Sequence, residues 1–224
     1  LSLIHQFLED DTTQVFVLLG YAGTGKTTLI SEVVKQLEQD ERAFKLLATT
    51  GRAAKVLQNK TGHAAGTVHG CIYAFDEVMQ RKSEEGQKED GGQLQLKFQL
   101  RASLTSPADT VFIIDEASMI THETAGKGHA ARFGSGSLLN DLFAFAEGRK
   151  IIFVGDPCQL PPIAANPFSS ALSPEFLAQE YQVRVAQSEL TGIIRQADGS
   201  EILDLASPFR QDIRSKFFVK YPKV

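Results

Sequence analysis

Short apolar runs recur along the chain and alternate with segments in which apolar residues follow helical spacing. Four of these runs, at residues 15–19, 44–48, 111–114 and 151–154, are bounded by glycine, acidic or turn residues. Continuously apolar strands that alternate with helices are typical of a parallel sheet covered on both faces. The pattern therefore predicts an α/β fold whose ligands bind at the carboxyl ends of the strands.

A phosphate-binding loop follows the first apolar run. Residues 20–27 read G-Y-A-G-T-G-K-T, which matches the complete pattern G-x-x-x-x-G-K-[ST]. Apolar residues then recur at helix spacing, so strand, loop and helix succeed one another as this motif requires. The alternative is a glycine-rich turn that caps an ordinary helix, and the strand–loop–helix context disfavours it.

The residue types in this loop suit a nucleoside triphosphate. Glycines let backbone N–H groups approach the β- and γ-phosphates, the helix N-terminus adds a positive dipole, and Lys26 adds a full charge. The Thr27 hydroxyl is of the kind that ligates Mg²⁺. We therefore predict ATP and Mg²⁺ as cofactors, with the nucleotide bound by Gly20, Ala22, Gly23, Thr24, Gly25, Lys26, Thr27 and Thr28.

Polar residues that suit ATP hydrolysis follow the later apolar runs. Asp115 can hold the hydration shell of Mg²⁺, and Glu116 can act as general base toward the attacking water. Gln159 can hydrogen-bond the γ-phosphate, although a proline-rich turn without a catalytic role fits the same residues. Arg195 can stabilise charge in the transition state, although an isolated arginine is usually solvated. The candidates are thus Lys26, Glu116, Gln159 and Arg195 for catalysis, and Thr27 and Asp115, the latter through water, for the metal.

Alternation at period two appears between the second and third runs. Leu94, Leu96, Phe98 and Leu100 alternate with polar residues and predict a half-buried antiparallel strand, with residues 72–75 as a plausible partner. Residues 81–93, charged and glycine-containing, would link the two strands. We interpret residues 72–104 as a β-hairpin inserted into the main domain.

A second unusual stretch, at residues 121–137, combines glycines with basic residues. We expect a flexible surface loop here rather than a loop that binds phosphate or nucleic acid.

Composition and charge limit the binding partners and the cellular location that we expect for the protein. The length of 224 residues suits one large α/β domain with an insertion. The net charge of −4 argues against a surface coated by nucleic acid but leaves room for a local basic groove. Cys71 and Cys158 match no metal or disulfide spacing, so we expect reduced thiols. The sequence has no signal-peptide pattern and no apolar run of about 18 residues, which predicts a cytoplasmic protein without a membrane partner.

Six motifs, in this order along the chain, resemble the first RecA-like motor domain of superfamily 1 DNA helicases, in the branch that contains RecD and Dda. The phosphate loop is similar to motif I, D-E-A-S at 115–118 to motif II, and G-D-P-C-Q-L-P-P at 155–162 to motif III. T-T-G-R-A-A at 49–54 is similar to motif Ia, T-V-H at 67–69 to the motif after it, and residues 190–196 to motif IV. The resemblance covers about residues 15–200. It implies a P-loop NTPase with a RecA-like parallel sheet, which couples ATP hydrolysis to DNA unwinding.

The resemblance also implies a nucleic-acid site. In this branch the loops that match Thr50 and Arg52, and Thr67 and His69, contact single-stranded DNA, and the motor acts at junctions of single- and double-stranded DNA in the 5′ to 3′ direction. A capping or core role for His69 stays open. Gln159 would couple the γ-phosphate to the DNA groove.

The inserted hairpin lies where this branch carries a pin that separates the strands. Tyr73, Phe75 and Phe98 are aromatic candidates for contact with the duplex. They equally suit the hairpin's own small core, and we expect that role for at least two of them.

The resemblance is incomplete at both ends. The motifs of a second RecA-like domain do not follow Arg195, and the glutamine motif that reads adenine is not recognisable. We therefore expect a motor domain at residues 1–207, and a tail at residues 208–224 that fits the start of a second domain. Subunits of a repair nuclease are partners by resemblance to RecD.

Two other functions stay open. A phosphoryl transferase acting on a small molecule would use residues 121–137 as a lid, but it leaves G-D-P-C-Q-L-P-P unexplained. A module that binds nucleotide or DNA without turnover is what we expect of this chain by itself, because the catalytic cleft of a helicase needs two domains.

Overall fold

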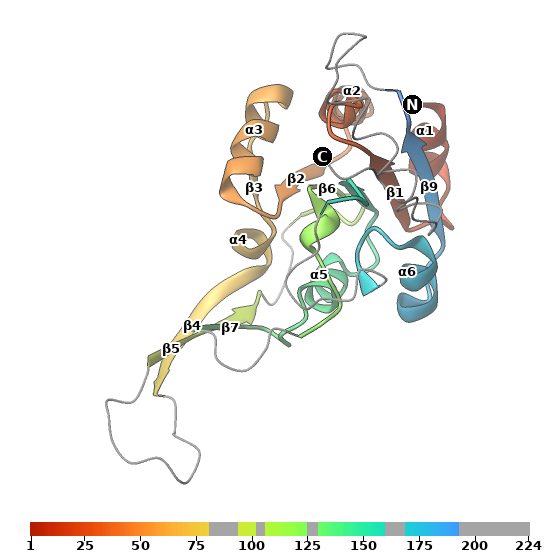
Figure 1. The fold of residues 1–224 in the computed structure, drawn as a ribbon. Coiled ribbons are helices and arrows are strands. Elements are labelled where there is room, and N and C mark those ends of the chain that lie inside the picture. The colour runs from red at the N-terminus through yellow and green to blue at the C-terminus, as the bar shows by residue number, and fades with distance from the viewer. Residues whose placement is uncertain (81–93, 102–105, 125–129, 160–168, 193–224) are drawn as a thin grey trace, which may run out of the picture.

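Helices and strands alternate along most of the chain (Figure 1). A computed structural model describes residues 1–80, 94–101, 106–124, 130–159 and 169–192. The helices are α1 (Ser2–Glu9), α2 (Lys26–Gln39), α3 (Gly51–Thr61), α4 (Val68–Ile72), the 3₁₀ turn η1 (Ala117–Met119), α5 (Leu138–Ala146) and α6 (Pro174–Tyr181). The strands are β1 (Val15–Gly20), β2 (Phe44–Ala48), β3 (Ala65–Thr67), β4 (Tyr73–Gln80), β5 (Leu94–Leu100), β6 (Val111–Asp115), β7 (Ala131–Phe133), β8 (Ile151–Gly155) and β9 (Val185–Leu190).

Within the described residues, one sheet contains six parallel strands in the order β3-β2-β6-β8-β1-β9. Its four central strands are those that the apolar runs predict. The edge strands β3 and β9 do not follow from the pattern, because β3 has only three residues and β9 carries three consecutive polar residues, Q-S-E at 187–189. This arrangement confirms the predicted parallel α/β sheet.

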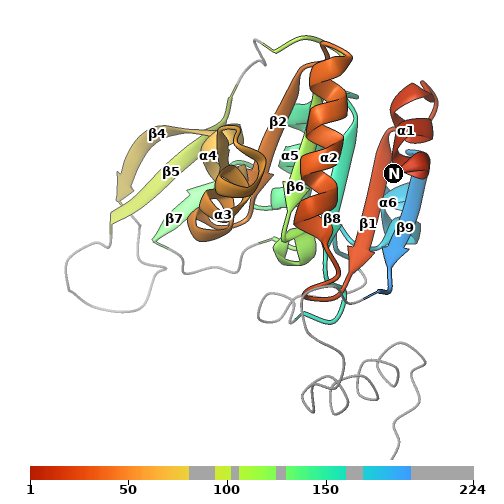
Figure 2. The same cartoon turned by 90° about the horizontal axis from the view of Figure 1, so that it is seen from above.

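Side chains of the central strands alternate between two buried layers. On one side, Phe16 and Ile113 pack in a cluster with residues of α1, α2 and α3. On the other side, Val17 and Phe112 pack with residues of α4, α5 and α6. Figure 2 shows α2 lying along one face of the strands, with α5 on the opposite face. Each such side chain stabilises the fold by about 1.5–3 kcal/mol when it is fully buried. The helices that bury these side chains cover both faces of the sheet, as predicted.

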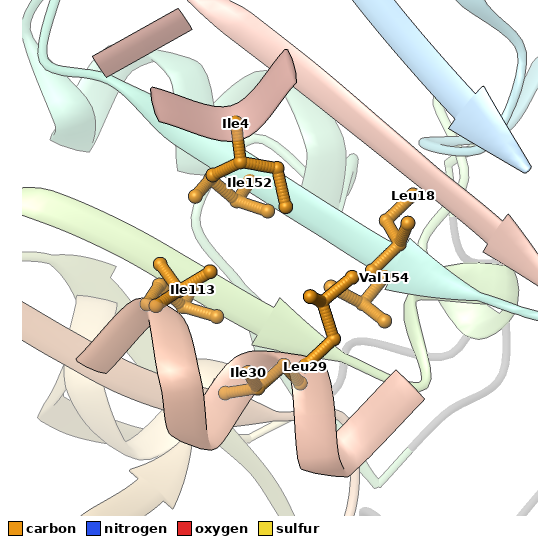
Figure 3. A pocket seen from close by; sticks show the side chains of 8 residues that line it. Ile4, Leu18, Leu29, Ile30, Ile113, Ile152 and Val154 are labelled. Atoms are coloured by element: carbon orange, nitrogen blue, oxygen red, sulfur yellow. The ribbon is translucent and has the colours of Figure 1, made fainter. Parts of the chain in front are cut away.

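A small cavity remains in the first of these layers. It is lined by aliphatic side chains alone, among them Ile4 of α1, Ile30 of α2 and Ile113 of β6 (Figure 3). A buried water needs two or more polar partners, so this lining cannot hold one, and we interpret the cavity as a gap in the packing of the core.

A second, smaller sheet has the order β4-β5-β7 and projects from the main sheet (Figure 1). β4 and β5 are antiparallel, with Tyr73 opposite Leu100 and Phe75 opposite Phe98, and a bulge follows Phe75. This confirms the predicted hairpin, except that Ile72 ends α4 and residues 102–104 lie outside the described residues. The linking residues 81–93 also lie outside them.

The prediction of a loop at residues 121–137 is wrong at Thr121 and at residues 131–133, which pair with other parts of the chain. Ala131–Phe133 forms β7, which pairs in parallel with β5, and Thr121 forms a β-bridge with Ser170. A three-residue strand is too short to show alternation, and glycines on both sides hide it further.

The two cysteines, Cys71 and Cys158, do not form a disulfide with each other. Over the described ranges, none of the helices combines the length and apolar character needed to cross a bilayer.

Candidate nucleotide-binding site

Three loops that carry candidate residues leave neighbouring strands at one edge of the sheet. β8 lies between β6 and β1, with Gly155 opposite Leu19 of β1 and Phe153 opposite Ile114 of β6. Because the strands are parallel, their carboxyl ends meet at the same edge. The phosphate loop, Asp115 and the turn that holds Gln159 are therefore brought together.

The backbone of the phosphate loop takes the shape that its glycines allow. Gly23 and Gly25 have φ angles of 85° and 87°, in the left-handed region that side chains disfavour. Gly25 is the N-cap of α2 and has no side chain to accept the first N–H groups of that helix. A Cβ at Gly20 would lie 2.7 Å from the Thr24 hydroxyl, which is buried and donates to the carbonyl of Tyr21 at 2.8 Å.

Lys26 begins α2 and turns back over the loop. Its side chain is largely buried, and Nζ donates to the carbonyl oxygens of Gly20 at 2.7 Å and Tyr21 at 3.0 Å. An ammonium held over a loop of exposed N–H groups suits the phosphates of a nucleotide. Thr27 is half-buried and Thr28 exposed in the same first turn, and Ala22 is exposed in the loop.

Asp115 ends β6 as a buried carboxylate. Burial raises its pKa to about 6; the charge of Glu116 adds to the rise, while Lys26 and the N–H of Glu116, which donates at 2.9 Å, oppose it. Burial destabilises the charged form of this carboxylate, and a nearby Mg²⁺ would stabilise that form. Asp115 is therefore well suited to a site that binds a cation.

Glu116 follows Asp115 in an uncommon backbone conformation. Its φ of 55° and ψ of 38° are left-handed, which is rare and strained for a residue with a side chain. Its carbonyl accepts a hydrogen bond of 3.4 Å from the hydroxyl of Thr49, in the loop after β2. The candidate general base is thus connected to the neighbouring strand end.

Asp156, to which the sequence analysis assigns no role, joins two of the loops. Its carboxylate is only 4% exposed and accepts from the N–H of Ala22 at 3.2 Å and of Cys158 at 2.9 Å. The signal that points to it is the one that identifies Asp115, namely an acid directly after a buried strand.

Gln159 lies beside the other candidate residues. Its Oε1 accepts a hydrogen bond of 3.3 Å from the hydroxyl of Ser118, three residues after Asp115. The side chain is therefore turned toward the segment after β6. Arg195 lies outside the described residues.

The four candidate DNA-binding residues lie further along the same edge. Thr50 and Thr67 cap α3 and α4, because their hydroxyls accept from Ala53 N at 3.2 Å and Gly70 N at 3.1 Å. Ala48 of β2 is opposite Asp115 on one side and Thr67 on the other, so these caps adjoin the candidate nucleotide site.

Arg52 and His69 differ in environment. Arg52 is exposed in the first turn of α3. His69 is half-buried; its ring lies 5.0 Å from the ring of Phe133, and burial lowers its pKa. His69 thus packs against Phe133, a contact that fits the core role left open by the sequence.

The sequence of this chain is similar to a known protein family and to individual proteins. The profile of a family described as an AAA domain matches residues 2–221. The ATP-dependent RecD2 DNA helicase of Deinococcus radiodurans is 30% identical over 153 residues, which cover 68% of this chain and 17% of that protein. An uncharacterized protein of Methanocaldococcus jannaschii is 30% identical over 205 residues, covering 88% of this chain and 15% of that protein. The chain thus spans less than a third of the length of these relatives.

The fold is also found among solved structures. The crystal structure of Pif1 helicase from Candida albicans superposes with a TM-score of 0.52 and 18% identity, covering 99% of this chain and 48% of that one. At this identity the likeness shows a shared fold, and it agrees with the RecA-like architecture that the motifs imply.

Proposed function

The chain belongs to the AAA domain family, and from this premise we propose that it is the ATP-binding first motor domain of a DNA helicase or translocase. The observation that carries the proposal is the meeting of the phosphate loop, Asp115 and Gln159 at three adjacent strand ends. The sequence relationship to a RecD2 DNA helicase supports the substrate.

ATP with Mg²⁺ fits the residues at this edge. The left-handed glycines and the N-terminus of α2 would hold the phosphates, with Lys26 as the counter-charge. Thr27 and Asp115 would hold the metal ion, Asp115 through water. Bound ATP would supply the phosphoryl group, whose transfer to water would release the energy for movement, and Mg²⁺ would offset the charge on the phosphates.

The protein's own residues would then act on water and charge. Glu116 would orient the attacking water and accept its proton. Gln159 would hydrogen-bond the γ-phosphate, and Arg195 would offset the charge that develops there. The bond between Ser118 and Gln159 supports a role for Gln159 in reporting nucleotide state to the segment after β6.

Single-stranded DNA would cross the same edge beside the nucleotide. Thr50 and Arg52 at the end of β2, and Thr67 and His69 at the end of β3, would contact its backbone or bases. The hairpin at residues 72–104 would act as the strand-separating pin, with the exposed ring of Phe75 as the aromatic contact. Movement from 5′ to 3′, nuclease subunits as partners and a cytoplasmic, DNA-associated location rest on the resemblance.

ATP turnover by this chain, with and without a single-stranded oligonucleotide, tests the proposal. Lys26→Ala is the blank, because it removes the ammonium over the loop, and we expect it to abolish nucleotide binding. Lys35→Ala is the matched control, since Lys35 lies on the same helix but is exposed and paired with Glu32 at 2.7 Å.

Each result has a distinct meaning. Turnover stimulated by the strand would support a nucleic-acid motor. Nucleotide binding that Lys26→Ala removes, without turnover, would indicate that catalysis needs a second domain. Turnover indifferent to DNA would contradict the motor and favour phosphoryl transfer to a small molecule.

A further inference from the structure

A buried phenol–carboxylate pair lies at the root of the hairpin, away from the candidate nucleotide site. Tyr73, the first residue of β4, donates its hydroxyl to Oδ2 of Asp141 on α5 at 2.6 Å. The two side chains are 4% and 5% exposed. A hydrogen bond to a charged, buried acceptor is among the stronger ones in proteins, so this contact ties β4 firmly to α5.

The same carboxylate also holds the end of β7. The backbone N–H of Ser135 donates to Asp141, at 3.0 Å to Oδ2 and 3.3 Å to Oδ1. Gly134, with a φ of 40°, passes so close that a Cβ would collide with this carboxylate. One acidic side chain thus fastens both outer strands of the second sheet, and the glycine-rich stretch supplies the close approach.

Aromatic rings complete the connection. The ring of Phe133 on β7 stacks on Phe98 of β5 at 4.7 Å and lies 5.2 Å from Tyr73. On its other side it meets His69 of α4 at 5.0 Å. The three strands are therefore packed together at their root and against the helix that follows β3.

α5 links this root to the strands of the candidate site. Leu139 and Leu142 of α5 pack in one buried cluster with Phe112 of β6 and Phe153 of β8. These two strands end at Asp115 and before Asp156. The far end of the described strands, by contrast, carries exposed apolar side chains, with Val78 at 51% and Leu94 at 67%. Its orientation depends on its root.

We propose that Tyr73 and Asp141 are positioning residues that fix β4 and β5 rigidly to the motor domain, so that movement of the motor is delivered to the duplex through these strands. The inference rests on the proposed function for its use, and on the contacts above for the attachment itself. A hairpin loosened at its root would yield to the duplex instead of parting it.

Hydrogen exchange of this chain, compared among wild type and three variants, tests the attachment without DNA or ATP. Tyr73→Phe removes only the hydroxyl and leaves the ring in the aromatic cluster. Tyr181→Phe is the matched control, because the Tyr181 hydroxyl donates to Asn140, the residue before Asp141 on α5, at 2.6 Å. Asp141→Asn is a second variant, which keeps the shape but weakens the acceptor.

We expect Tyr73→Phe to speed exchange of the β4 and β5 amides about tenfold or more, since a bond to a charged group contributes at least that factor. Amides of β1, β6 and β8 should keep their protection, as should the hairpin in Tyr181→Phe. Equal hairpin protection in wild type and Tyr73→Phe would overturn the proposal.

A second readout is duplex unwinding, measured on a protein in which this domain is joined to a second motor domain. Tyr73→Phe should lower the rate of duplex unwinding severalfold and leave strand-stimulated ATP hydrolysis unchanged. Unwinding and hydrolysis that fall equally would overturn the positioning role. A wild-type protein that hydrolyses ATP without response to DNA would contradict the proposed function instead, and hydrogen exchange would still decide the attachment.

Discussion

The backbone N–H of Ala22 donates to Oδ2 of Asp156, 3.2 Å away, so the phosphate loop after β1 is bonded to the loop after β8. The other oxygen of this buried carboxylate accepts from Cys158, in the turn that carries Gln159. Two loops that are distant in sequence and adjacent in space are thereby held by one side chain. The phosphate loop and the Gln159 turn should consequently shift together when either is displaced.

Removal of this carboxylate should destabilise the fold. We expect Asp156→Ala to lower the free energy of unfolding by about 1–3 kcal/mol, because two backbone N–H donors lose their acceptor in partly buried hydrogen bonds. Asp156→Asn should cost less, since an amide oxygen can still accept one of the bonds. Urea denaturation without nucleotide measures both. Asp109→Ala, at an exposed aspartate, is the control, and a stability of Asp156→Ala equal to wild type would contradict the bridging role.

Asp115 should make the protein less stable as the pH rises through the window between its two pKa values. Burial holds its folded pKa near 6, against 3.8 for an ordinary aspartate, so the folded state keeps a proton that the unfolded chain has released. The free energy of unfolding therefore falls as the pH rises from about 4 to about 6. The difference of about two pH units between the two pKa values corresponds to a total loss of about 3 kcal/mol above pH 6.

Asp115→Asn removes this ionisation and keeps an oxygen for the N–H of Glu116. In EDTA and without nucleotide, we expect the variant to be more stable than wild type by up to about 3 kcal/mol at pH 8 and nearly equal to it at pH 4. Unfolding followed across this range provides the measurement. A constant difference between the two proteins at every pH would show that Asp115 does not titrate in this window.

Most of the central fold follows from the sequence because it depends on strong local signals. The four buried strands appear as continuous apolar runs, and the helix after the phosphate loop shows helical periodicity over a long enough stretch to be identified. The edge strands and β7 do not, since their short or mixed sequences become strands only by pairing with a neighbour.

In the candidate site, too, some residues can be identified from the sequence and others cannot. Motifs locate Lys26, Asp115 and Gln159, because fixed spacing after a strand end carries the information. The contacts of Asp156 and Asp141 do not follow from the sequence, because their partners lie 134 and 68 residues away in the chain. The buried strand before Asp156 marks it as a candidate, whereas only the tertiary structure distinguishes Asp141 from a solvated acid.

Gln159 should affect coupling more than binding. In a protein in which this domain is joined to a second motor domain, we expect Gln159→Ala to leave ATP affinity within about threefold and to lower DNA-stimulated hydrolysis by about 100-fold, the usual loss when one group that stabilises the transition state is removed. Ser118→Ala, which removes the donor to Gln159 Oε1 but keeps the amide, should give a smaller loss. Full DNA stimulation in Gln159→Ala would exclude the sensor role.

Arg52 is a sharper probe of the DNA edge than Thr50. The Thr50 hydroxyl caps α3, so its removal should cost about 1 kcal/mol of stability whether or not DNA binds there. Arg52 is exposed in the same turn, and its loss should weaken binding without unfolding the domain. If it neutralises one phosphate of a single strand, Arg52→Ala should lower the slope of log K against log salt by about 0.7.

Binding titrations over a range of salt concentrations give this slope. Lys60→Ala is the matched control, because Lys60 is an exposed cation in the last turn of the same helix, about 12 Å along its axis. Equal losses of slope in both variants would indicate a diffuse electrostatic effect of α3. A loss confined to Arg52→Ala would place one phosphate at the carboxyl end of β2, beside the strand that carries Asp115.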